Sequence, residues 1–211
     1  MISVAVIGLT GQTGAGKSTV SKIFSENGFA LIDADKISRD VVEIGKPCLI
    51  ELVDYFGNQI LNADNSLNRK ALAKIVFTDK CKLESLNSIC HPFITEEIFR
   101  LIHQNAHAGK HLILLDAPTL FESKASDFCD MIISVIANPE LRCQRIMQRD
   151  NLTRELALER MNAQLEETFF VQHSDYIIKN NASLEQLSAY AKEVADKLKV
   201  YCQEKYLNQV T

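Results

Sequence analysis

The sequence predicts an α/β fold in which helices cover both faces of a parallel five-stranded sheet, giving three layers. Short apolar runs bounded by turns alternate with helical patterns, and this alternation is typical of such a sheet. A glycine-rich stretch, GLTGQTGAGKST, lies between the first apolar run and an amphipathic helical pattern. A long segment without a buried strand then interrupts the alternation, and its length predicts a helical insertion.

Five strands are expected in the apolar runs, which are Ser3 to Gly8, Phe29 to Ile32, His111 to Leu115, Met131 to Ala137 and Tyr176 to Ile178. The first helix carries Val20, Ile23 and Phe24 on one face, and Gly28 is placed to end it. The last helix follows a candidate N-cap, Ser183. Its apolar stripe consists of Leu184, Leu187, Ala191, Val194, Leu198 and Tyr201.

The insertion contains helix-like segments in place of buried strands. The two clearest are Arg69 to Phe77 and Pro92 to Ala108, and a turn-rich patch, Asn62 to Asn68, precedes the first. An insertion of this size is too long for a simple crossover, and one that follows the carboxyl end of a strand lies beside the ligand crevice. We therefore expect a helical substrate-binding subdomain at 36–110 and a nucleotide-binding core formed by 1–35, 111–140 and 166–211.

Composition limits the partners of the protein. The chain has 211 residues, 46% hydrophobic and 24% charged, which suits one α/β domain or one domain with an insertion. Its formal net charge of −4 argues against wholesale nucleic-acid binding, which needs a basic surface. The six cysteines form no C-x-x-C pair and lack metal-ligand spacing, which favours reduced thiols in a cytosolic protein. The apolar run Ile2 to Leu9 is too short to span a bilayer, and no later segment is long enough, so we expect a cytoplasmic protein without membrane contact.

Residues Gly11 to Ser18 match the pattern G-x-x-x-x-G-K-[ST] of a phosphate-binding P-loop. Gly11, Gly14 and Gly16 allow backbone conformations in which several N–H groups point at phosphate oxygens. Lys17 supplies charge to the β and γ oxygens, and the Ser18 hydroxyl is a ligand for Mg²⁺. The helix that begins near Lys17 adds its N-terminal dipole. The strand before the loop and the helix after it favour a nucleotide site over a chance match, but they do not name the reaction.

An arginine-rich segment, 141–165, is expected to form a lid over the nucleotide. No lysine occurs between Lys124 and Lys179, whereas five arginines do: Arg142, Arg145, Arg149, Arg154 and Arg160. The first three lie at i, i+3 and i+7 and therefore share one helix face. Guanidinium groups match phosphate oxygens in pairs and stay charged when desolvated, as a closing lid requires. The alternative is a solvated helix in which the arginines pair with Glu140, Glu155 and Glu159, and the P-loop in the same chain favours the lid.

Three aspartates follow predicted strands. Asp33 and Asp35 come at the carboxyl end of the second strand, where a carboxylate can accept or orient the proton of an attacking hydroxyl. We assign Asp35 to the acceptor hydroxyl and Asp33 to a supporting role, and capping of the next helix is the alternative for one of them. Asp116 ends the run HLILLD, where it either holds the water shell of Mg²⁺ or satisfies local backbone donors. With no N-K-x-D motif of a switch-type GTPase, these features favour phosphoryl transfer to a small molecule.

In this order, the motifs resemble those of the dephospho-CoA kinase family over nearly the whole chain. The loop is common to many kinases, whereas LIDADKISRDVV, LNSICHPFI and HSDYIIKNN carry more particular elements. Further matching segments are GKP, YFG, LNRKALAKIVF, DAPTLFE, RIMQRD and ERMNAQ. The resemblance implies a nucleotide-monophosphate-kinase-like sheet, a helical CoA-binding subdomain and a lid. It also implies transfer of the γ-phosphate of ATP to the ribose 3′-hydroxyl of dephospho-CoA.

The resemblance further implies roles for individual residues. Asp35 aligns with the catalytic aspartate of the family and Arg145 with its catalytic arginine, and they act beside Lys17 of the loop. The implied ATP-binding residues are Gly11, Gly14, Ala15, Gly16, Lys17, Ser18 and Thr19 in the loop, Arg149 in the lid, and Asn180 near the adenine. On the acceptor side, the implied residues are Asp33, Asp35, His91 and Pro92, with His91 shaping the pocket.

The sequence departs from the family pattern at Gln12, Thr13 and Thr119. The first two occupy variable positions of the loop, so phosphate binding is expected to survive. Thr119 puts a hydroxyl into an apolar stretch, and a buried hydroxyl needs a partner. Two other interpretations remain: a nucleoside or nucleoside-monophosphate kinase with another acceptor, and a P-loop regulatory module that holds ATP without transferring phosphate. We expect a monomer, with a weak trimer as the alternative.

Overall fold

The computed structural model describes residues 4–207. The chain forms two compact units, of which the first runs up to Ile32 and resumes at Ile102, and the second is Asp33–Leu101. The expected functional division, with a substrate-binding subdomain at 36–110 and a lid at 141–165, stays a prediction.

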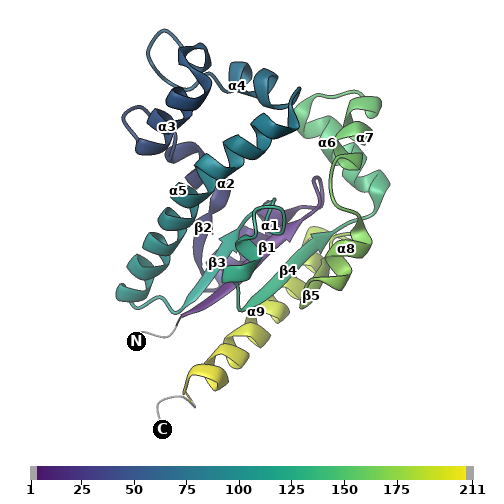
Figure 1. Ribbon diagram of the computed structural model, residues 1–211. Coiled ribbons are helices and arrows are strands. Elements are labelled where there is room, and N and C mark those ends of the chain that lie inside the picture. The colour runs from purple at the N-terminus through teal and green to yellow at the C-terminus, as the bar shows by residue number, and fades with distance from the viewer. Residues whose placement is uncertain (1–3, 208–211) are drawn as a thin grey trace. The chain divides into compact units, whose positions relative to one another are not determined.

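The first unit contains a five-stranded parallel sheet in the order β2-β3-β1-β4-β5 (Figure 1). Its strands are β1 (Ala5–Gly11), β2 (Ala30–Asp33), β3 (Leu112–Asp116), β4 (Met131–Ile136) and β5 (Tyr176–Lys179). Each lies within three residues of the boundaries that the apolar runs predict, and Ser3 falls outside the described residues. The predicted α/β class with a five-stranded parallel sheet is therefore confirmed.

The register of the sheet gathers the carboxyl ends of the strands at one edge. Leu9 of β1 pairs with Asp116 of β3, and Gly11 pairs with Val135 of β4. In turn, Ile136 of β4 pairs with Lys179, the last residue of β5. The phosphate loop, Asp116 and the segment after β5 consequently leave the sheet at the edge where α/β proteins bind their ligands.

One face of the sheet is covered by α1 (Lys17–Glu26) and α9 (Leu184–Leu207), which contact each other. Figure 1 shows α9, in yellow, running alongside the strands. Ile7 and Leu9 of β1 are fully buried in the core that these helices form with the sheet. Apolar burial of this extent is the main stabilising contribution to such a layer.

The buried stripe of α9 differs from the predicted one at both ends. Leu184 and Tyr201 are 63% and 39% exposed, whereas Ala195 and Cys202 are buried. Leu184 is the first residue of the helix. Position 202 lies four residues, about one helical turn, after Leu198 and therefore on the same buried face, whereas position 201 lies at the edge of the stripe. The four central positions, Leu187, Ala191, Val194 and Leu198, are buried as predicted.

The opposite face of the sheet is covered by the segments that follow β3 and α7. The hydroxyl of Ser134 in β4 hydrogen-bonds at 2.7 Å to the hydroxyl of Ser174, which follows α8 (Glu167–Gln172). A Cβ atom at Gly8 would lie 2.8 Å from the side chain of Leu120 on this face. With helices on both faces, the three-layer arrangement is confirmed. Two further helices, α6 (Pro139–Asp150) and α7 (Arg154–Asn162), contact each other and share a small apolar core.

The second unit is helical and has its own core. It consists of α2 (Ala34–Asp40), α3 (Pro47–Phe56), the 3₁₀ turn η1 (Asn58–Ile60), α4 (Arg69–Val76) and most of α5 (Lys80–His107). Its buried side chains are Val42, Cys48, Leu52, Phe56, Ile60, Leu72 and Val76. The helical insertion that the sequence predicts is therefore present, and α4 agrees with the predicted segment Arg69 to Phe77 to within one residue.

The predicted start of the following helix was wrong. The sequence analysis places it at Pro92, a residue that is common in the first turn of a helix. In the structure α5 begins at Lys80, and Pro92 lies inside it. An interior proline removes one hydrogen bond of the helix. Leu83, Leu86 and Ile89, which precede it, pack against the core of the second unit, and this packing offsets the loss.

The described part of the chain has no helix that combines the length and the apolar character needed to cross a membrane. The six cysteines, all within the described residues, form no disulfide bond, and the Sγ atoms of Cys48 and Cys90 lie 3.7 Å apart in the second unit.

Candidate active site

The phosphate loop joins the end of β1 at Gly11 to the start of α1 at Lys17. Gly14 and Gly16 have φ values of 75° and 93°, a region that residues with a Cβ rarely adopt. They are also sites of close approach, because a Cβ at Gly14 would lie 2.7 Å from the Arg142 carbonyl oxygen and one at Gly16 2.3 Å from Asn180 Nδ2. The P-loop pattern therefore reflects both backbone conformation and packing at these positions.

Three consecutive carbonyl groups of the loop are held from outside by side chains. Arg142 Nε donates to the Thr13 carbonyl at 2.9 Å, and Arg145 Nη1 donates to the Gly14 carbonyl at 3.3 Å. The amide of Asn180 donates to the Ala15 carbonyl at 2.8 Å. In a trans peptide the C=O of one residue and the N–H of the next point in opposite directions. The three contacts therefore turn the N–H groups of the following residues to the other side of the loop.

Two of these N–H groups, together with two at the start of α1, are available to an anion. Ala15 N donates to the carbonyl of Gln12 at 3.0 Å. Among residues 4–207, no hydrogen bond uses the N–H groups of Gly14, Gly16, Lys17 or Ser18. Because Gly16 is the N-cap of α1, these donors combine with the positive end of the helix dipole. The arrangement is a cradle for phosphate oxygens.

Lys17 and Asp116 form an ion pair at the carboxyl edge of the sheet. Lys17 Nζ donates to Asp116 Oδ1, and the two side chains are only 19% and 12% exposed. The pair connects the first turn of α1 to the last residue of β3. It places the carboxylate next to the loop, so Asp116 has a specific side-chain partner in addition to any backbone donors.

Hard oxygen donors for a magnesium ion are present beside the loop. Ser18 is exposed in the first turn of α1, and its hydroxyl and the carboxylate of Asp116 are ligands of the kind that Mg²⁺ prefers. The described residues contain no group of three or more His, Cys, Asp or Glu side chains that could hold a metal ion. This donor set fits Mg²⁺, which is commonly bound by one or two protein oxygens together with substrate phosphates and waters.

The predicted arginine face of α6 is divided in the structure. Arg142 is 4% exposed, and burial, opposed by the charge of Glu167, lowers the pKa of its guanidinium from the usual value. Arg145 contacts the loop and also donates to the Asn180 carbonyl at 3.3 Å through both Nη atoms. The Arg149 guanidinium instead forms two hydrogen bonds with Asp150, which raise the pKa of Arg149. Arg142 and Arg145 are thus brought to the loop, whereas Arg149 is paired with a carboxylate.

The two arginines of α7 also have acidic partners. Arg154 makes two hydrogen bonds, at 2.8 and 2.7 Å, to the carboxylate of Glu140, as the alternative of a solvated helix anticipated for that glutamate. Arg160 donates to Asp150, whose pKa is lowered first by its hydrogen bond with Arg149. Ion pairs on the exposed side of the hairpin therefore connect α7 to α6.

The expected acceptor residues lie in the second unit. Asp33 is the N-cap of α2 and accepts a hydrogen bond at 2.9 Å from Lys36 N, so the capping alternative holds for this residue. Asp35 is exposed in the first turn of the same helix. His91 is half-buried and Pro92 exposed, both within α5. The negative charges of Asp33 and Asp35 also stabilise α2, because they lie at the positive end of its dipole.

A cavity in the second unit brings two arginines together. It is lined by Arg39, Val42, Glu43, Ile44, Ser66, Leu67 and Arg69. Within the described residues neither guanidinium forms an ion pair or a side-chain hydrogen bond. With one carboxylate against two guanidinium groups, the lining has an excess of positive charge.

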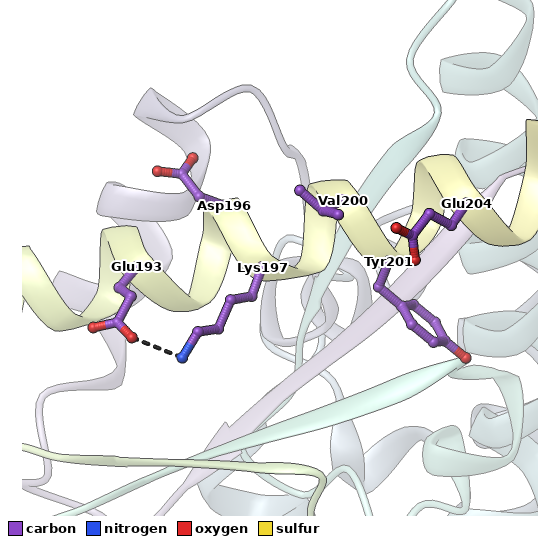
Figure 2. A pocket seen from close by; sticks show the side chains of 6 residues that line it. All are labelled: Glu193, Asp196, Lys197, Val200, Tyr201 and Glu204. Carbon is purple, nitrogen blue, oxygen red and sulfur yellow. Dashed lines mark ion pairs between the residues drawn. The ribbon is translucent and has the colours of Figure 1, made fainter.

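A second groove runs along the outer side of α9. All six lining residues come from this one helix, and Figure 2 shows Glu193 and Lys197 on the same side of it, joined by an ion pair of 2.7 Å. The groove includes none of the residues of the phosphate loop. It is a surface feature of one helix, and we assign it no part in the candidate site.

The three departures from the family pattern have different surroundings. Gln12 is 5% exposed, and its N–H donates to the carbonyl of Val135 at 3.2 Å. The N–H of Thr13 donates at 2.7 Å to Oε1 of Gln164. Thr119 is exposed, so the expected burial of its hydroxyl was wrong, because this residue lies in a turn after β3 and not in the buried strand. Exposure removes the need for a protein partner.

Two contacts of the loop were not predicted from the sequence. Arg142 was expected to face phosphate with the other arginines, but it supports the outer side of the loop, and the contact of Gln164 with Thr13 was not predicted. The only signal in the sequence was their position in the segments that resemble the family, close to RIMQRD and at the end of ERMNAQ. Neither position reveals a contact with a residue 129 or 151 places earlier in the chain.

The sequence matches known proteins over most of its length. A family model for dephospho-CoA kinase matches residues 5–186. A dephospho-CoA kinase of Listeria monocytogenes is 46% identical over 180 residues, which cover 85% of this chain and 90% of the relative. One of Fusobacterium nucleatum is 41% identical over 186 residues, covering 88% and 94%.

Solved structures give the same result. A crystal structure of the Thermus thermophilus protein TT1252 superposes with a TM-score of 0.79 at 30% identity, covering 93% of this chain and 98% of that one. Dephospho-CoA kinase from Campylobacter jejuni superposes with a TM-score of 0.69 at 28% identity, covering 92% and 96%. The match of the family model over most of the chain, together with these relatives, shows that the chain belongs to the dephospho-CoA kinase family.

Proposed function

We propose that this protein transfers the γ-phosphate of ATP to the ribose 3′-hydroxyl of dephospho-CoA, giving coenzyme A and ADP. The observation that carries this proposal is the set of N–H groups in and after the loop that form no hydrogen bond within the described residues. Those of Gly14 and Gly16 are turned away from the held carbonyl groups, and those of Lys17 and Ser18 begin α1. Membership of the family supplies the acceptor.

Three residues carry the chemistry in this proposal. Lys17 neutralises charge on the β and γ oxygens as the bond to the γ-phosphate breaks. Arg145 exchanges its contacts with the carbonyl oxygens of Gly14 and Asn180 for the transferred group and stabilises the charge that spreads over it. Asp35 accepts the proton of the attacking 3′-hydroxyl and orients its oxygen. Asp33 supports Asp35 by fixing the first turn of α2.

Binding residues complete the site. The loop from Gly11 to Thr19 holds the phosphates of ATP, Arg149 joins them from the lid, and Asn180 lies near the adenine. His91 and Pro92 shape the acceptor side. The Ser18 hydroxyl would hold Mg²⁺, with Asp116 acting through a bound water. When bound, this ion neutralises charge on the β and γ phosphates and fixes their orientation.

Arg149 needs a change of partner to act in this way. In the structure its guanidinium binds Asp150, which also binds Arg160. Asp150 is half-buried and accepts two hydrogen bonds from Arg149, so exchange of this partner for a phosphate has a cost that the new contact must offset. The proposal therefore includes closure of the α6–α7 lid, with Arg160 left to neutralise Asp150.

The proposed enzyme is cytoplasmic and monomeric, and it has no nucleic-acid or membrane partner. The net charge of −4 supports the absence of extended phosphate-backbone binding. Sedimentation velocity across a range of protein concentrations tests the monomer, and a trimer that forms as concentration rises would contradict it.

The test of the function is ATP consumption by the purified protein with Mg²⁺, comparing dephospho-CoA with AMP, CMP, UMP and uridine. We expect turnover with dephospho-CoA alone and coenzyme A as the product. Phosphorylation of a nucleotide or of uridine in its place would support the nucleoside or nucleoside-monophosphate kinase. ATP binding without turnover on any acceptor would support the regulatory module.

A further inference from the structure

Both backbone groups of Thr13, in the middle of the phosphate loop, are held by side chains from distant parts of the chain. Its N–H donates to Gln164 Oε1 at 2.7 Å, and its carbonyl accepts from Arg142 Nε at 2.9 Å. The two contacts fix the peptide planes before and after this residue. No other residue of the loop from Gln12 to Ala15 has side chains on both of its backbone groups among the described contacts.

The two side chains come from opposite ends of one hairpin. Arg142 lies in the first turn of α6, and Gln164 directly follows Ala163, the C-cap of α7. The helices between them share a buried core of Cys143, Ile146 and Ala157. The hairpin of α6 and α7 is therefore attached to the loop both where it begins and where it ends, at a single residue.

We infer that Gln164 and Arg142 are positioning residues that hold Thr13 so that the loop is already shaped for the phosphates of ATP. Holding the Thr13 carbonyl outward turns the N–H of Gly14 inward, since the two groups belong to one peptide plane. A loop with glycines at positions 11, 14 and 16 has large conformational freedom when it is not restrained. Restraint in the free protein lowers the entropy lost on ATP binding. The inference rests on the proposed function, in which this loop binds ATP.

Gln164 provides the sharper test, because Arg142 is 4% exposed and its replacement endangers folding. Gln164 is half-buried, and a methionine in its place keeps the length of the side chain without an oxygen acceptor. We expect Gln164→Met to raise both KM for ATP and the dissociation constant of ATP about tenfold, the effect of one lost hydrogen bond. The kcat and the KM for dephospho-CoA should change by less than about threefold.

Two further variants separate positioning from a general structural role. Gln164→Glu keeps an acceptor for the Thr13 N–H, and in buffer with enough salt to screen its charge it should bind ATP within about threefold of the parent. Gln144→Met is the matched control, because Gln144 is an exposed glutamine of α6 whose contact is with Glu140. It should bind ATP as the parent does, and all three variants should keep the parent melting temperature.

The ATP dissociation constant is measured by titration without acceptor, so it is independent of turnover. An unchanged constant in Gln164→Met would overturn the inference, even if the protein is an active kinase. A loss of melting temperature accompanied by equal weakening for both substrates would also overturn it, in favour of a structural role. If the parent protein fails to make coenzyme A while Gln164→Met still weakens ATP binding, the proposed function is wrong and the positioning role stands.

Discussion

The two units present their candidate residues in different ways. In the unit with the sheet, the phosphate loop is surrounded by fixed contacts, and Arg142, Arg145 and Asn180 hold its carbonyl groups at 2.9, 3.3 and 2.8 Å. In the helical unit, Asp35 is exposed in the first turn of a seven-residue helix, and Pro92 is exposed on α5. The difference teaches that the candidate phosphate donors are organised within one unit, whereas the other unit presents its candidate groups on helix surfaces.

Charge pairing shows the same contrast. On the α6–α7 hairpin Arg149, Arg154 and Arg160 all pair with carboxylates. In the helical unit Arg39 and Arg69 line one cavity, and within the described chain neither has an ion pair. The proposed acceptor, dephospho-CoA, carries a diphosphate, and we expect the two arginines of this cavity to bind it without first breaking an ion pair.

The largest effect is expected at Asp35, the proposed proton acceptor. A variant of this residue also separates the chemical step from nucleotide binding. Asp35→Asn removes the proton acceptor and should lower kcat about 10³-fold. The dissociation constant of ATP should stay within about twofold, since the loop and its supporting side chains belong to the other unit. Asp54→Asn, an exposed aspartate of α3, is the control for loss of charge in the same unit. Parallel loss of ATP binding in Asp35→Asn would contradict the division between units.

The second effect distinguishes two arginines of α6. Arg145→Ala should lower kcat about 10³-fold, the scale expected for an arginine that neutralises charge in the transition state. Arg149→Ala should cost less, about tenfold, because this guanidinium must first leave Asp150. Steady-state kinetics with saturating ATP measures both. Equal losses in the two variants would mean that the pairing seen in the structure has no consequence for the reaction.

Stability offers a third comparison, since each unit has its own core. Leu52 is fully buried in the helical unit, and Leu52→Ala should lower the free energy of unfolding by about 2–5 kcal/mol. Leu198, fully buried beneath the sheet, is the matched position in the other unit, and Leu198→Ala should cost a similar amount.

The KM values for the two substrates should distinguish the effects of the two core substitutions. We expect Leu52→Ala to raise KM for dephospho-CoA more than KM for ATP, and Leu198→Ala to do the reverse. Urea unfolding and steady-state kinetics on the same samples provide the measurements. If both variants weaken both substrates equally, the two units do not divide the substrates between them.

The sequence predicted the sheet well, because its strands are short apolar runs between turns. The boundaries of β4 and β5 agree to within one residue. The start of α5 was missed since Pro92 is a local signal for a first turn, whereas the helix depends on packing of Leu83 and Leu86 against a core assembled from distant residues. Local preference fails where tertiary packing outweighs it.

Prediction of the site had the same limit. The loop is a local motif, so its glycines, Lys17 and Ser18 could be named from their spacing. The contact of Asn180 with the Ala15 carbonyl joins residues 165 positions apart, and it depends on the register of β4 and β5. Periodicity placed Arg142 on a face with Arg145 but could not show that it turns toward a carbonyl of the loop. Such contacts require the arrangement of the strands.

The smallest effect tests the unpaired arginines of the helical unit. Arg69→Ala should raise KM for dephospho-CoA about tenfold, because one charged hydrogen bond to the diphosphate is lost, and it should leave kcat and KM for ATP within about twofold. Lys70→Ala removes the neighbouring exposed cation of α4, which does not line the cavity, and should change neither constant.

Glu43 makes this last comparison sharper, because it is the one carboxylate among the residues that line the cavity. Glu43→Gln removes its repulsion of an anionic acceptor and should lower KM for dephospho-CoA by about twofold to fivefold. Added salt should shrink the effects of Arg69→Ala and Glu43→Gln together, as expected for partly exposed charges. Opposite signs for the two variants would locate acceptor charge at this cavity. An effect of Lys70→Ala equal to that of Arg69→Ala would instead mean that the helical unit attracts the acceptor only through its overall charge.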